Sequence, residues 1–380
     1  MEEGFGGVVI KGMVVRIGLI TTIGRNIGDD LIRRGIQLLL EEILGEGKVN
    51  FSLIDKEWPS IFMHALGLNK GGQSLGFLLG ESINTLLGEF WRDRFNGFDL
   101  IVNCGAPLLW PACHSNVWPK VLWRKVIRQI YRKTPVLNMA IGSCYPWESQ
   151  PSFISDPGEA EFLSSVVRYC RLTTVRDFLA WKLFLSLGIE VPFIPCTAFL
   201  SAKGKEKESA ENIIIVNYMH GAGHYDWGQG IDASKWFGVV KLLVSRLKSR
   251  HKVVFLCHNR IEFENALRID PSLPRVWPKR VEEYFEIIPR AKAALCNRMH
   301  ASIALAGLGI PSVAVGTDTR MLMIRALGLP TIYAKEAEVD LLEDMLENQV
   351  KLYHQERERL LILRDEVWCR YFQVVSEVLV

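Results

Sequence analysis

The chain has 380 residues, of which 49% are hydrophobic and 23% are charged, with 45 basic against 42 acidic side chains. This length favours two domains, and this composition excludes an intrinsically disordered chain. The net charge of only +3 gives no indication that bulk charge attracts a nucleic acid. It does not exclude a local basic cleft.

Strands and helices alternate along the first half of the sequence. The β-branched run at residues 14–22 predicts a strand that ends in a glycine turn, and apolar spacing over residues 29–44 predicts a helix. This order of strand, turn and helix is the opening unit of a nucleotide-type fold. The same pattern predicts later strands at 98–103, 135–141, 171–175 and 191–194, and helices at 117–133, 159–169 and 178–187.

A charged segment, SAKGKEKESAEN at residues 201–212, interrupts this alternation and is the best candidate for a domain boundary. We therefore predict an N-terminal domain at residues 1–204 and a C-terminal domain at residues 205–380. The alternation resumes with strands at 213–217, 252–257, 293–296, 312–315 and 331–333, helices at 234–249, 300–308 and 319–327, and a tail of two helices.

The fold class follows from this alternation. Strands that alternate with helices form mostly parallel sheets, so we predict an α/β protein with two Rossmann-like domains. Open α/β sheets bind ligands at the carboxyl ends of their strands, which places the functional site in a cleft between the two domains.

The cysteines and the apolar runs bear on the cellular compartment. Eight cysteines are scattered without a CxxC pair, which we interpret as reduced, mostly buried thiols with no structural zinc. Residues 1–12 lack the basic start and the cleavage site of a signal peptide, and no charge-free run has membrane-spanning length. We therefore predict a cytoplasmic protein, with peripheral attachment to the inner face of a membrane left open.

Two polar segments follow predicted strands in the first half. Asn26 and Gly28 lie at a helix start, where backbone N–H groups attract anions, while Asp29 and Asp30 suit the helix dipole or a substrate hydroxyl. A glycine turn with an acidic N-cap explains this segment equally well. Further along, Arg176 follows a strand, where it either pairs with an aspartate or binds phosphate or carboxylate in the cleft.

The third segment, CNRMHASIALAGLGIP at residues 296–311, carries the strongest signal. It places Arg298 and His300 between a buried strand and a helix of small residues, where both side chains are able to face the cleft. Burying either group without a partner costs several kcal/mol. The pattern therefore favours a ligand site over a core histidine.

Three segments together carry a family resemblance. NIGDD at residues 26–30, TTVRDFLAWKLFLSLGI at residues 173–189 and CNRMHASIALAGLGIPSVAV at residues 296–315 resemble, in this order, the polysaccharide pyruvyl transferase family. The resemblance extends from about residue 14 to residue 329. Characterised members transfer a pyruvyl group from phosphoenolpyruvate to a sugar, forming a ketal, on a fold similar to that of the GT-B glycosyltransferases.

The resemblance implies roles for particular residues. Arg298 and His300 match the donor-binding and catalytic pair, Arg176 matches a strand-end arginine, and we place Asn26 and Gly28 on the donor side as well. Arginine forks suit the phosphate and carboxylate of phosphoenolpyruvate, and histidine is a general acid or base near neutral pH. Phosphoenolpyruvate is then the donor substrate, with no cofactor and no metal required.

The implied acceptor is a sugar or a lipid-linked glycan, and the sequence predicts neither its identity nor an oligomeric state. The loop at residues 220–227 holds two histidines around glycines, which favours a cleft loop over a metal site. Aromatic faces near strand ends are able to stack on sugar rings. The acceptor-side candidates are Asp29, Asp30, Trp110, Trp118, Trp147, His114, His220 and His224.

The sequence departs from the family pattern at NCGAP, residues 103–107, and at PCTAF, residues 195–199. These departures leave two alternatives open. One is a GT-B-type glycosyltransferase with a nucleotide-sugar donor, for which Glu336 and Glu338 are the nearest candidates to hold a ribose. The other is an inactive family member that acts as a binding subunit.

Overall fold

The computed structural model describes residues 14–58, 85–206, 211–288 and 291–379. Residues 1–12, on which the prediction about a signal peptide rests, lie outside the described residues, as do residues 207–210 of the predicted boundary segment. Among the described residues, we find no helix with the length and apolar character needed to cross a membrane. Each cysteine is a free thiol, and most of them are buried.

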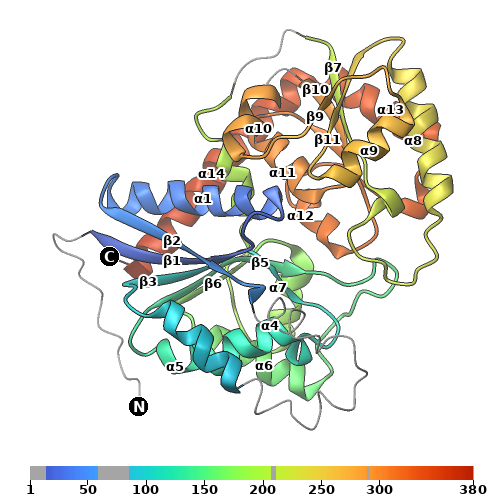
Figure 1. Cartoon of the computed structure of the whole chain (residues 1–380). Helices are drawn as coiled ribbons and strands as arrows, with labels where there is room; N and C mark the ends of the chain where they lie inside the picture. The colour runs from blue at the N-terminus through green and yellow to red at the C-terminus, as the bar shows by residue number, and fades with distance from the viewer. Residues whose placement is uncertain (1–13, 59–84, 207–210, 289–290, 380) are drawn as a thin grey trace.

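The first half of the chain forms a parallel sheet with the strand order β2-β1-β3-β5-β4, in which β6 also pairs with β5. Helices cover both of its faces (Figure 1). The strands are β1 (Val15–Thr21), β2 (Val49–Asp55), β3 (Leu100–Cys104), β4 (Pro107–Leu109), β5 (Val136–Ser143) and β6 (Leu172–Val175). The helical elements are α1 (Ile27–Leu44), η1 (Asp93–Phe95), η2 (Cys113–Ser115), α4 (Val117–Pro119), η3 (Lys120–Ile127), α5 (Arg128–Ile130), α6 (Pro157–Arg168), α7 (Phe178–Ser186) and η4 (Thr197–Ala202).

The second half forms another parallel sheet, in the order β12-β11-β10-β7-β8-β9. Its strands are β7 (Ile213–Asn217), β8 (Lys252–Leu256), β9 (Arg275–Val276), β10 (Ala291–Cys296), β11 (Ser312–Gly316) and β12 (Thr331–Tyr333). The helical elements are η5 (His220–Ala222), α8 (Ala233–Leu247), α9 (Arg260–Ile269), α10 (Val281–Ile287), α11 (Met299–Gly307), η7 (Thr319–Met321), α12 (Leu322–Arg325), η8 (Ala334–Glu336), α13 (Val339–Lys351) and α14 (Tyr353–Leu379).

The predicted class, α/β with two Rossmann-like domains and parallel sheets, is confirmed. The strand predicted at residues 191–194 is wrong, because only one bridge forms there, between Val175 and Phe193. Pro192 and Pro195 lack the backbone N–H that a longer ladder needs. The exact boundary between residues 204 and 205 stays a prediction.

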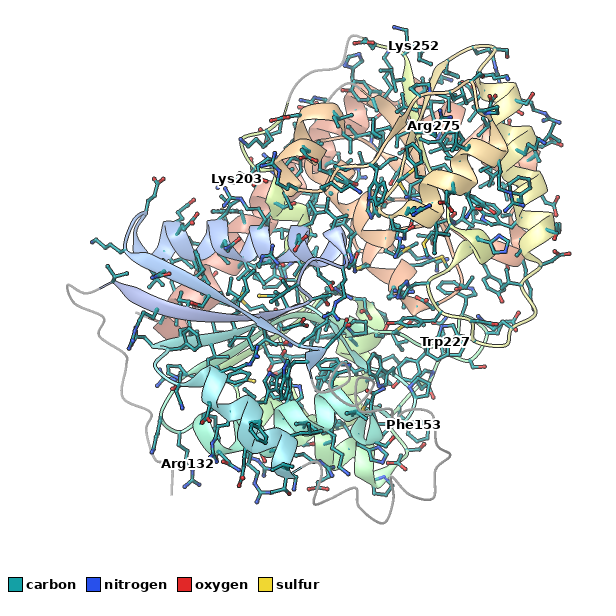
Figure 2. All side chains as sticks on the ribbon, viewed as in Figure 1. Arg132, Phe153, Lys203, Trp227, Lys252 and Arg275 are labelled. Atoms are coloured by element: carbon teal, nitrogen blue, oxygen red, sulfur yellow. The ribbon has the colours of Figure 1, made fainter. Side chains whose placement is uncertain are left out.

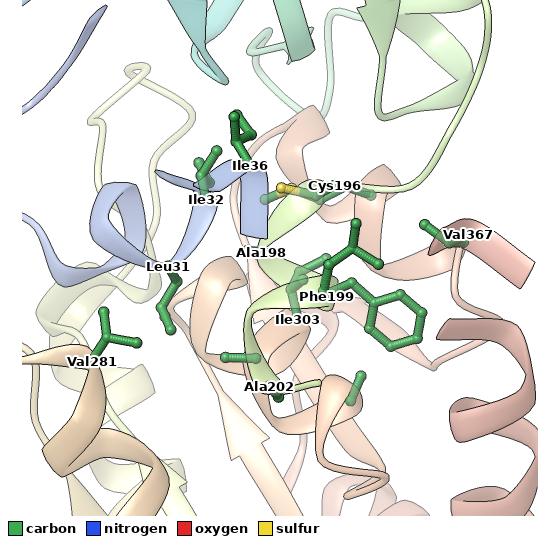
Figure 3. Packing of buried hydrophobic residues seen from close by; sticks show 14 of the residues in the cluster. Leu31, Ile32, Ile36, Cys196, Ala198, Phe199, Ala202, Val281, Ile303 and Val367 are labelled. Carbon is green, nitrogen blue, oxygen red and sulfur yellow. The ribbon is translucent and has the colours of Figure 1, made fainter. Parts of the chain in front are cut away.

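The two halves share one hydrophobic core at their junction (Figure 3). There α1 packs against η4 so closely that a Cβ on Gly35 would lie 1.9 Å from the Thr197 carbonyl oxygen. The last helix, α14, crosses back to the first half, where Trp368 Nε1 donates to Glu42 at 3.2 Å. This shared core fixes the two sheets against each other, so the groups at their carboxyl ends keep a defined spacing.

Candidate active site in the cleft between the sheets

The carboxyl ends of both sheets face one cleft of about 330 Å³. The start of α1 and the ends of β2 and β6 form one wall, and η5, the β10–α11 turn and η7 form the other. Thr319 ties the walls together, since its Oγ1 accepts from the Tyr145 backbone N–H at 2.9 Å and lies 2.8 Å from Ser143 Oγ. The cleft therefore lies where the fold prediction placed it.

Arg176 lies between β6 and α7 and is only 1% exposed. Its Nη1 contacts His300 Nε2 at 3.4 Å and Cys196 Sγ at 3.9 Å, while its Nη2 is buried without a hydrogen-bond partner. Within the described ranges Arg176 forms no ion pair, so the Arg–Asp pair that the sequence left open is not present. Asp177 instead caps α7 by accepting from Ala180 N–H at 2.8 Å, and it accepts from Ser143 Oγ at 2.9 Å.

A buried carboxylate from α9 holds Arg298 in place. Glu262, only 3% exposed, accepts from Arg298 Nε at 2.7 Å and pairs with its Nη2 at 2.6 Å. The Arg298 backbone N–H donates to Asn217 Oδ1 at 2.7 Å. Its Nη1 contacts His224 Nδ1 at 3.3 Å. One edge of the Arg298 guanidinium is therefore fixed, and the other faces the cleft loop that follows β7.

His300, the second residue of α11, fills the space between Arg176 and the start of α1. A guanidinium only donates hydrogen bonds, so His300 Nε2 is the acceptor in their contact. Removal from water and the positive charge of Arg176 lower the pKa of His300 to about 3. The imidazole of the unliganded protein is therefore neutral at pH 7.

Gly28 is required by the position of His300. A Cβ on Gly28 would lie 2.6 Å from His300 Nδ1 and 3.0 Å from His300 Cβ. We expect Gly28→Ala to lower the free energy of unfolding by about 1–3 kcal/mol, because the ring has to move. Urea denaturation measures this change. The matched control is Gly238→Ala in α8, where a Cβ meets nothing within 4 Å and alanine should stabilise the helix by up to about 1 kcal/mol. Stabilisation by both substitutions would contradict the packing of His300 on Gly28.

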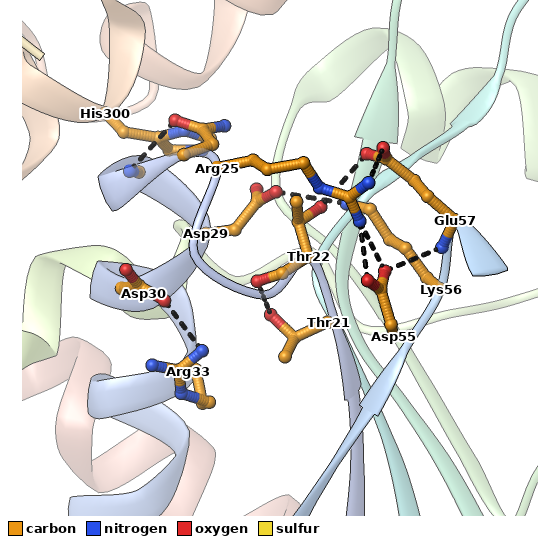
Figure 4. A network of polar contacts seen from close by, with 12 residues as sticks. Thr21, Thr22, Arg25, Asp29, Asp30, Arg33, Asp55, Lys56, Glu57 and His300 are labelled. Carbon is orange, nitrogen blue, oxygen red and sulfur yellow. Dashed lines mark hydrogen bonds and ion pairs between the residues drawn. The ribbon is translucent and has the colours of Figure 1, made fainter. Parts of the chain in front are cut away.

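The N-terminus of α1 differs from the acidic cap that the sequence left open. Asn26 is the N-cap and accepts from Gly28 N–H at 3.1 Å. Asp29 lines the cleft and pairs with Lys56 Nζ at 3.2 Å (Figure 4). Asp30 pairs with Arg33 at 2.7 Å instead, and the structure does not bring it to the cleft lining. The helical period turns consecutive residues to different sides.

The other acceptor-side candidates divide by position. Trp110 and Trp118 line the cleft and pack edge to face, with ring centroids 6.0 Å apart. His224 also lines it, and burial and nearby arginines lower its pKa to about 4. The structure does not bring the other three candidates to the cleft lining. His220 is exposed, Trp147 stacks on Tyr333, and His114 lies beside Asp156.

Sequence reasoning missed several cleft residues. Arg25, Lys56 and Glu57 surround the end of β2, and Arg25 Nη2 reaches Asp55 Oδ2 at 2.6 Å (Figure 4). The alternating polar and apolar residues of VNFSLID, residues 49–55, were the available signal for β2 as an edge strand, and this strand would have indicated these three residues. On the opposite wall of the cleft, Arg320 pairs with Asp318 at 2.6 Å.

The remaining features bear on metals and nucleotides. No group of three or more histidine, cysteine or acidic side chains is arranged to hold a metal ion in the part of the chain that the structure describes. Neither Glu336 nor Glu338 lines the cleft, and Glu338 pairs with Lys235 at 2.9 Å. The two residues considered for a nucleotide ribose therefore lie away from the site.

Solved structures similar to this chain share its fold. MnaA from S. aureus, solved with UDP, is 14% identical with a TM-score of 0.53 and 91% of each chain covered. The UDP-GlcNAc 2-epimerase from Neisseria meningitidis, bound to UDP-GlcNAc, is 12% identical, with a TM-score of 0.51, and the match covers 91% of this chain and 94% of that one. A glycotransferase of kitacinnamycin is 11% identical, with a TM-score of 0.52, and the match covers 97% of this chain and all of the other chain. These likenesses confirm the GT-B-like fold.

The comparison with family models identifies the family. No curated protein matches the sequence. The model described as polysaccharide pyruvyl transferase matches residues 26–319, a range that begins at the N-cap of α1 and ends at Thr319, next to the cleft residue Asp318. It includes Arg176, Arg298 and His300, all of which line the cleft. The chain belongs to the polysaccharide pyruvyl transferase family.

Proposed function

We propose that the protein transfers the pyruvyl group of phosphoenolpyruvate to two hydroxyls of a sugar, forming a cyclic ketal. Arg176 carries this proposal. Five cationic side chains line the cleft, and within the described residues Arg176 is the one without a carboxylate partner: the others are Arg25, Lys56, Arg298 and Arg320. A buried cation without a partner is costly, and an anionic ligand would remove that cost.

The surroundings of Arg176 suit a small dianionic donor. Cys196, from the PCTAF segment, contacts the guanidinium as a neutral thiol, because burial raises the thiol pKa. Arg298 supplies a second guanidinium on the opposite wall of the same cleft. Phosphoenolpyruvate carries a phosphate and a carboxylate, and planar guanidinium forks bind both groups.

The residues present account for the proton movements of the reaction. Neutral His300 removes the proton from the first acceptor hydroxyl and delivers it to the methylene carbon of the donor, while that oxygen bonds to the adjacent carbon. The C–O bond to phosphate then breaks as the second hydroxyl attacks the same carbon. The proton of the second hydroxyl leaves with the phosphate, so the products are the ketal and hydrogen phosphate. Arg176 and Arg298 offset the charge that develops on the leaving group.

The acceptor sugar has a place beside the donor. Trp110 and Trp118 present aromatic surface on the wall formed by the first sheet. Asp29 is buried there, and Lys56 lowers its pKa, so it is an ionised acceptor for sugar hydroxyls. Aromatic rings next to charged hydrogen-bonding groups suit a sugar ring, which has an apolar face and a polar edge.

The direct test is an assay for phosphate release and for the ketal. The protein is incubated with phosphoenolpyruvate and a panel of glycans, and mass spectrometry detects the ketal by a mass gain equal to pyruvic acid less one water. We expect phosphate and pyruvylated glycan in equal amounts. Glycosylation of the same acceptors with a nucleotide sugar, and no pyruvylation, would move the activity to glycosyl transfer.

The neutral state of His300 predicts a pH dependence. The free protein keeps His300 neutral because its pKa is about 3, and an anion bound beside the ring raises that pKa. At a pH between the two pKa values the complex holds one proton more than the free protein, so phosphoenolpyruvate binding takes up protons and tightens as the pH falls through the raised pKa. Above the raised pKa His300 stays neutral in the complex, as its role as a base requires. Calorimetry in buffers of different ionisation enthalpy measures this uptake.

The donor phosphate itself titrates near pH 6, so the uptake needs a matched control. His300→Gln keeps the contribution of the ligand and loses the part that depends on the imidazole. Equal proton uptake by the wild type and by His300→Gln would show that the bound anion does not reach His300.

A further inference from the structure

A basic surface lies on the outer side of the first half of the molecule, away from the second sheet (Figure 1). The residues 117–134, VWPKVLWRKVIRQIYRKT, include six lysines and arginines and no acidic residue. This concentration stands out in a chain whose net charge is only +3. Four of the cations recur at every fourth position: Lys120, Arg124, Arg128 and Arg132.

The structure turns this charge outward. The segment forms the continuous helical stretch α4–η3–α5, and its apolar side chains are buried against the first domain: Val121, Leu122, Trp123, Val126 and Ile127. Arg128 and Lys133 are exposed, and Figure 2 shows Arg132 at the outer edge of the molecule. The stretch is therefore an amphipathic element with a cationic outer face.

An open hollow of about 480 Å³ concentrates this charge at the end of the stretch. Its described lining residues are Arg128, Tyr131, Arg132, Arg168 and Tyr169, and none of these is a carboxylate. The two tyrosine rings lie 4.8 Å apart. Arg168 reaches the hollow from α6 and donates to Ser165 Oγ at 3.0 Å. Within the described part of the chain neither Arg168 nor Arg128 has an ion-pair partner, whereas Arg124, outside the hollow, pairs with Glu161 at 3.8 Å. Three guanidinium groups beside two phenol rings suit phosphate or carboxylate headgroups.

Exposed apolar side chains flank the same stretch. The helix at residues 85–92 lies beside it, with Lys125 Nζ donating to Thr85 Oγ1 at 3.2 Å and Arg92 Nη1 donating to Gln129 Oε1 at 2.5 Å. Leu86 and Phe90, four residues apart on this helix, are 53% and 61% exposed. Residues at this spacing share one face of a helix, so they form a small apolar wedge.

We propose that this surface docks the protein on a bilayer that contains anionic lipids. The guanidinium groups of the hollow would bind lipid headgroups, while Leu86 and Phe90 enter the boundary between headgroups and acyl chains. A soluble polyanion would be held by the cations alone and would gain nothing from an exposed Leu86 and Phe90, which favours the bilayer. This inference goes beyond the proposed function and does not depend on the identity of the donor.

The surface connects to the cleft along the helical stretch. Trp118, at its start, lines the cleft, while Arg128 lies in the hollow at its other end. A protein docked through this face would hold the Trp110 and Trp118 wall of the cleft close to the bilayer. Glycans attached to lipids are the acceptors that such an arrangement would present to the cleft.

Sedimentation with lipid vesicles tests the proposal. The full chain is mixed with phosphatidylcholine vesicles that contain either no anionic lipid or one third phosphatidylglycerol, at low and at high salt. We expect binding only to the anionic vesicles, and weaker binding at high salt because exposed charges are screened. Replacing three arginines of the hollow, Arg128→Gln, Arg132→Gln and Arg168→Gln, should weaken binding about 100-fold, given about 1 kcal/mol per charge.

The control removes the same charge from the second domain, at α8 and just after its end. Lys241 and Arg246 of α8 and Arg250, three residues after it, are exposed, and Lys241→Gln, Arg246→Gln and Arg250→Gln together should leave vesicle binding unchanged. A Phe90→Ala variant should weaken binding while its sensitivity to salt stays the same. Phosphate release with a soluble acceptor should persist in the hollow variant, which separates this test from the test of the proposed function.

Three results would overturn the proposal. They are no binding to anionic vesicles by the folded wild type, equal loss of binding in the hollow and α8 variants, and binding to dextran sulfate without binding to vesicles. The last result would identify a soluble polyanion as the partner of this surface.

Discussion

We expect Arg176→Gln to lower kcat/KM for phosphoenolpyruvate by about 10³-fold, the loss typical when a positive charge on a transferred or leaving phosphate is removed. Arg176 is buried beside His300, and its Nη2 has no hydrogen-bond partner among the residues that the structure describes. Arg176→Lys keeps the charge without the planar fork, so it should recover only part of the activity. Phosphate release under initial-rate conditions measures both variants.

The same substitution should not destabilise the unliganded protein. Arg176 forms no ion pair among the described residues, so removing its charge removes a desolvation cost, and we expect the Tm of Arg176→Gln to equal or exceed that of the wild type. Phosphoenolpyruvate should raise the Tm of the wild type and leave the variant unchanged. If the variant unfolds at a lower temperature and still turns over at the wild-type rate, then Arg176 stabilises the fold and does not bind the donor.

The second large effect is expected at His300. Removing a general acid–base group typically costs about 10²–10⁴-fold, so we expect His300→Gln to lower kcat by that amount. KM should change little, because Arg176 and Arg298 supply the charge that binds the donor. His220→Gln is the matched control, since His220 is exposed and lies outside the cleft lining.

A different outcome at His300 would change its role. A rise in KM without a fall in kcat would make His300 a binding group, since it would lose ground-state and transition-state binding equally. Rescue of His300→Gln turnover by added imidazole would support proton transfer. Full activity of His300→Gln would contradict the proposed mechanism.

Local patterns explain how much of the fold the sequence predicts. The buried strands β1 and β10 are mostly apolar, with only Arg16 and Lys292 as charged residues, and the cap of α7 is Asp177, two residues after β6. These elements are therefore determined by neighbouring residues. The edge strand β2 is half exposed and mixes polar with apolar residues, so its signal is weak. The bridge at Phe193 depends on pairing with β6, which sequence spacing does not reveal.

The site divides in the same way. Arg298 and His300 were identified because one short segment places both at a strand end. The charges around them were not predictable, since Glu262 reaches Arg298 from α9 and Lys56 reaches Asp29 from the end of β2. Asp30 lies away from Asp29 and the cleft because neighbouring residues on α1 face different partners. Ion pairs between distant segments are set by tertiary packing, which a single sequence does not display.

Calorimetry with phosphoenolpyruvate and with UDP tests the central claim most directly, because it asks which anion the cleft of the folded wild type is built to hold. We predict saturable binding of phosphoenolpyruvate that Arg176→Gln abolishes, and much weaker binding of UDP. Tight binding of UDP beside no binding of phosphoenolpyruvate would contradict the proposed donor and favour a nucleotide-sugar transferase on the same fold.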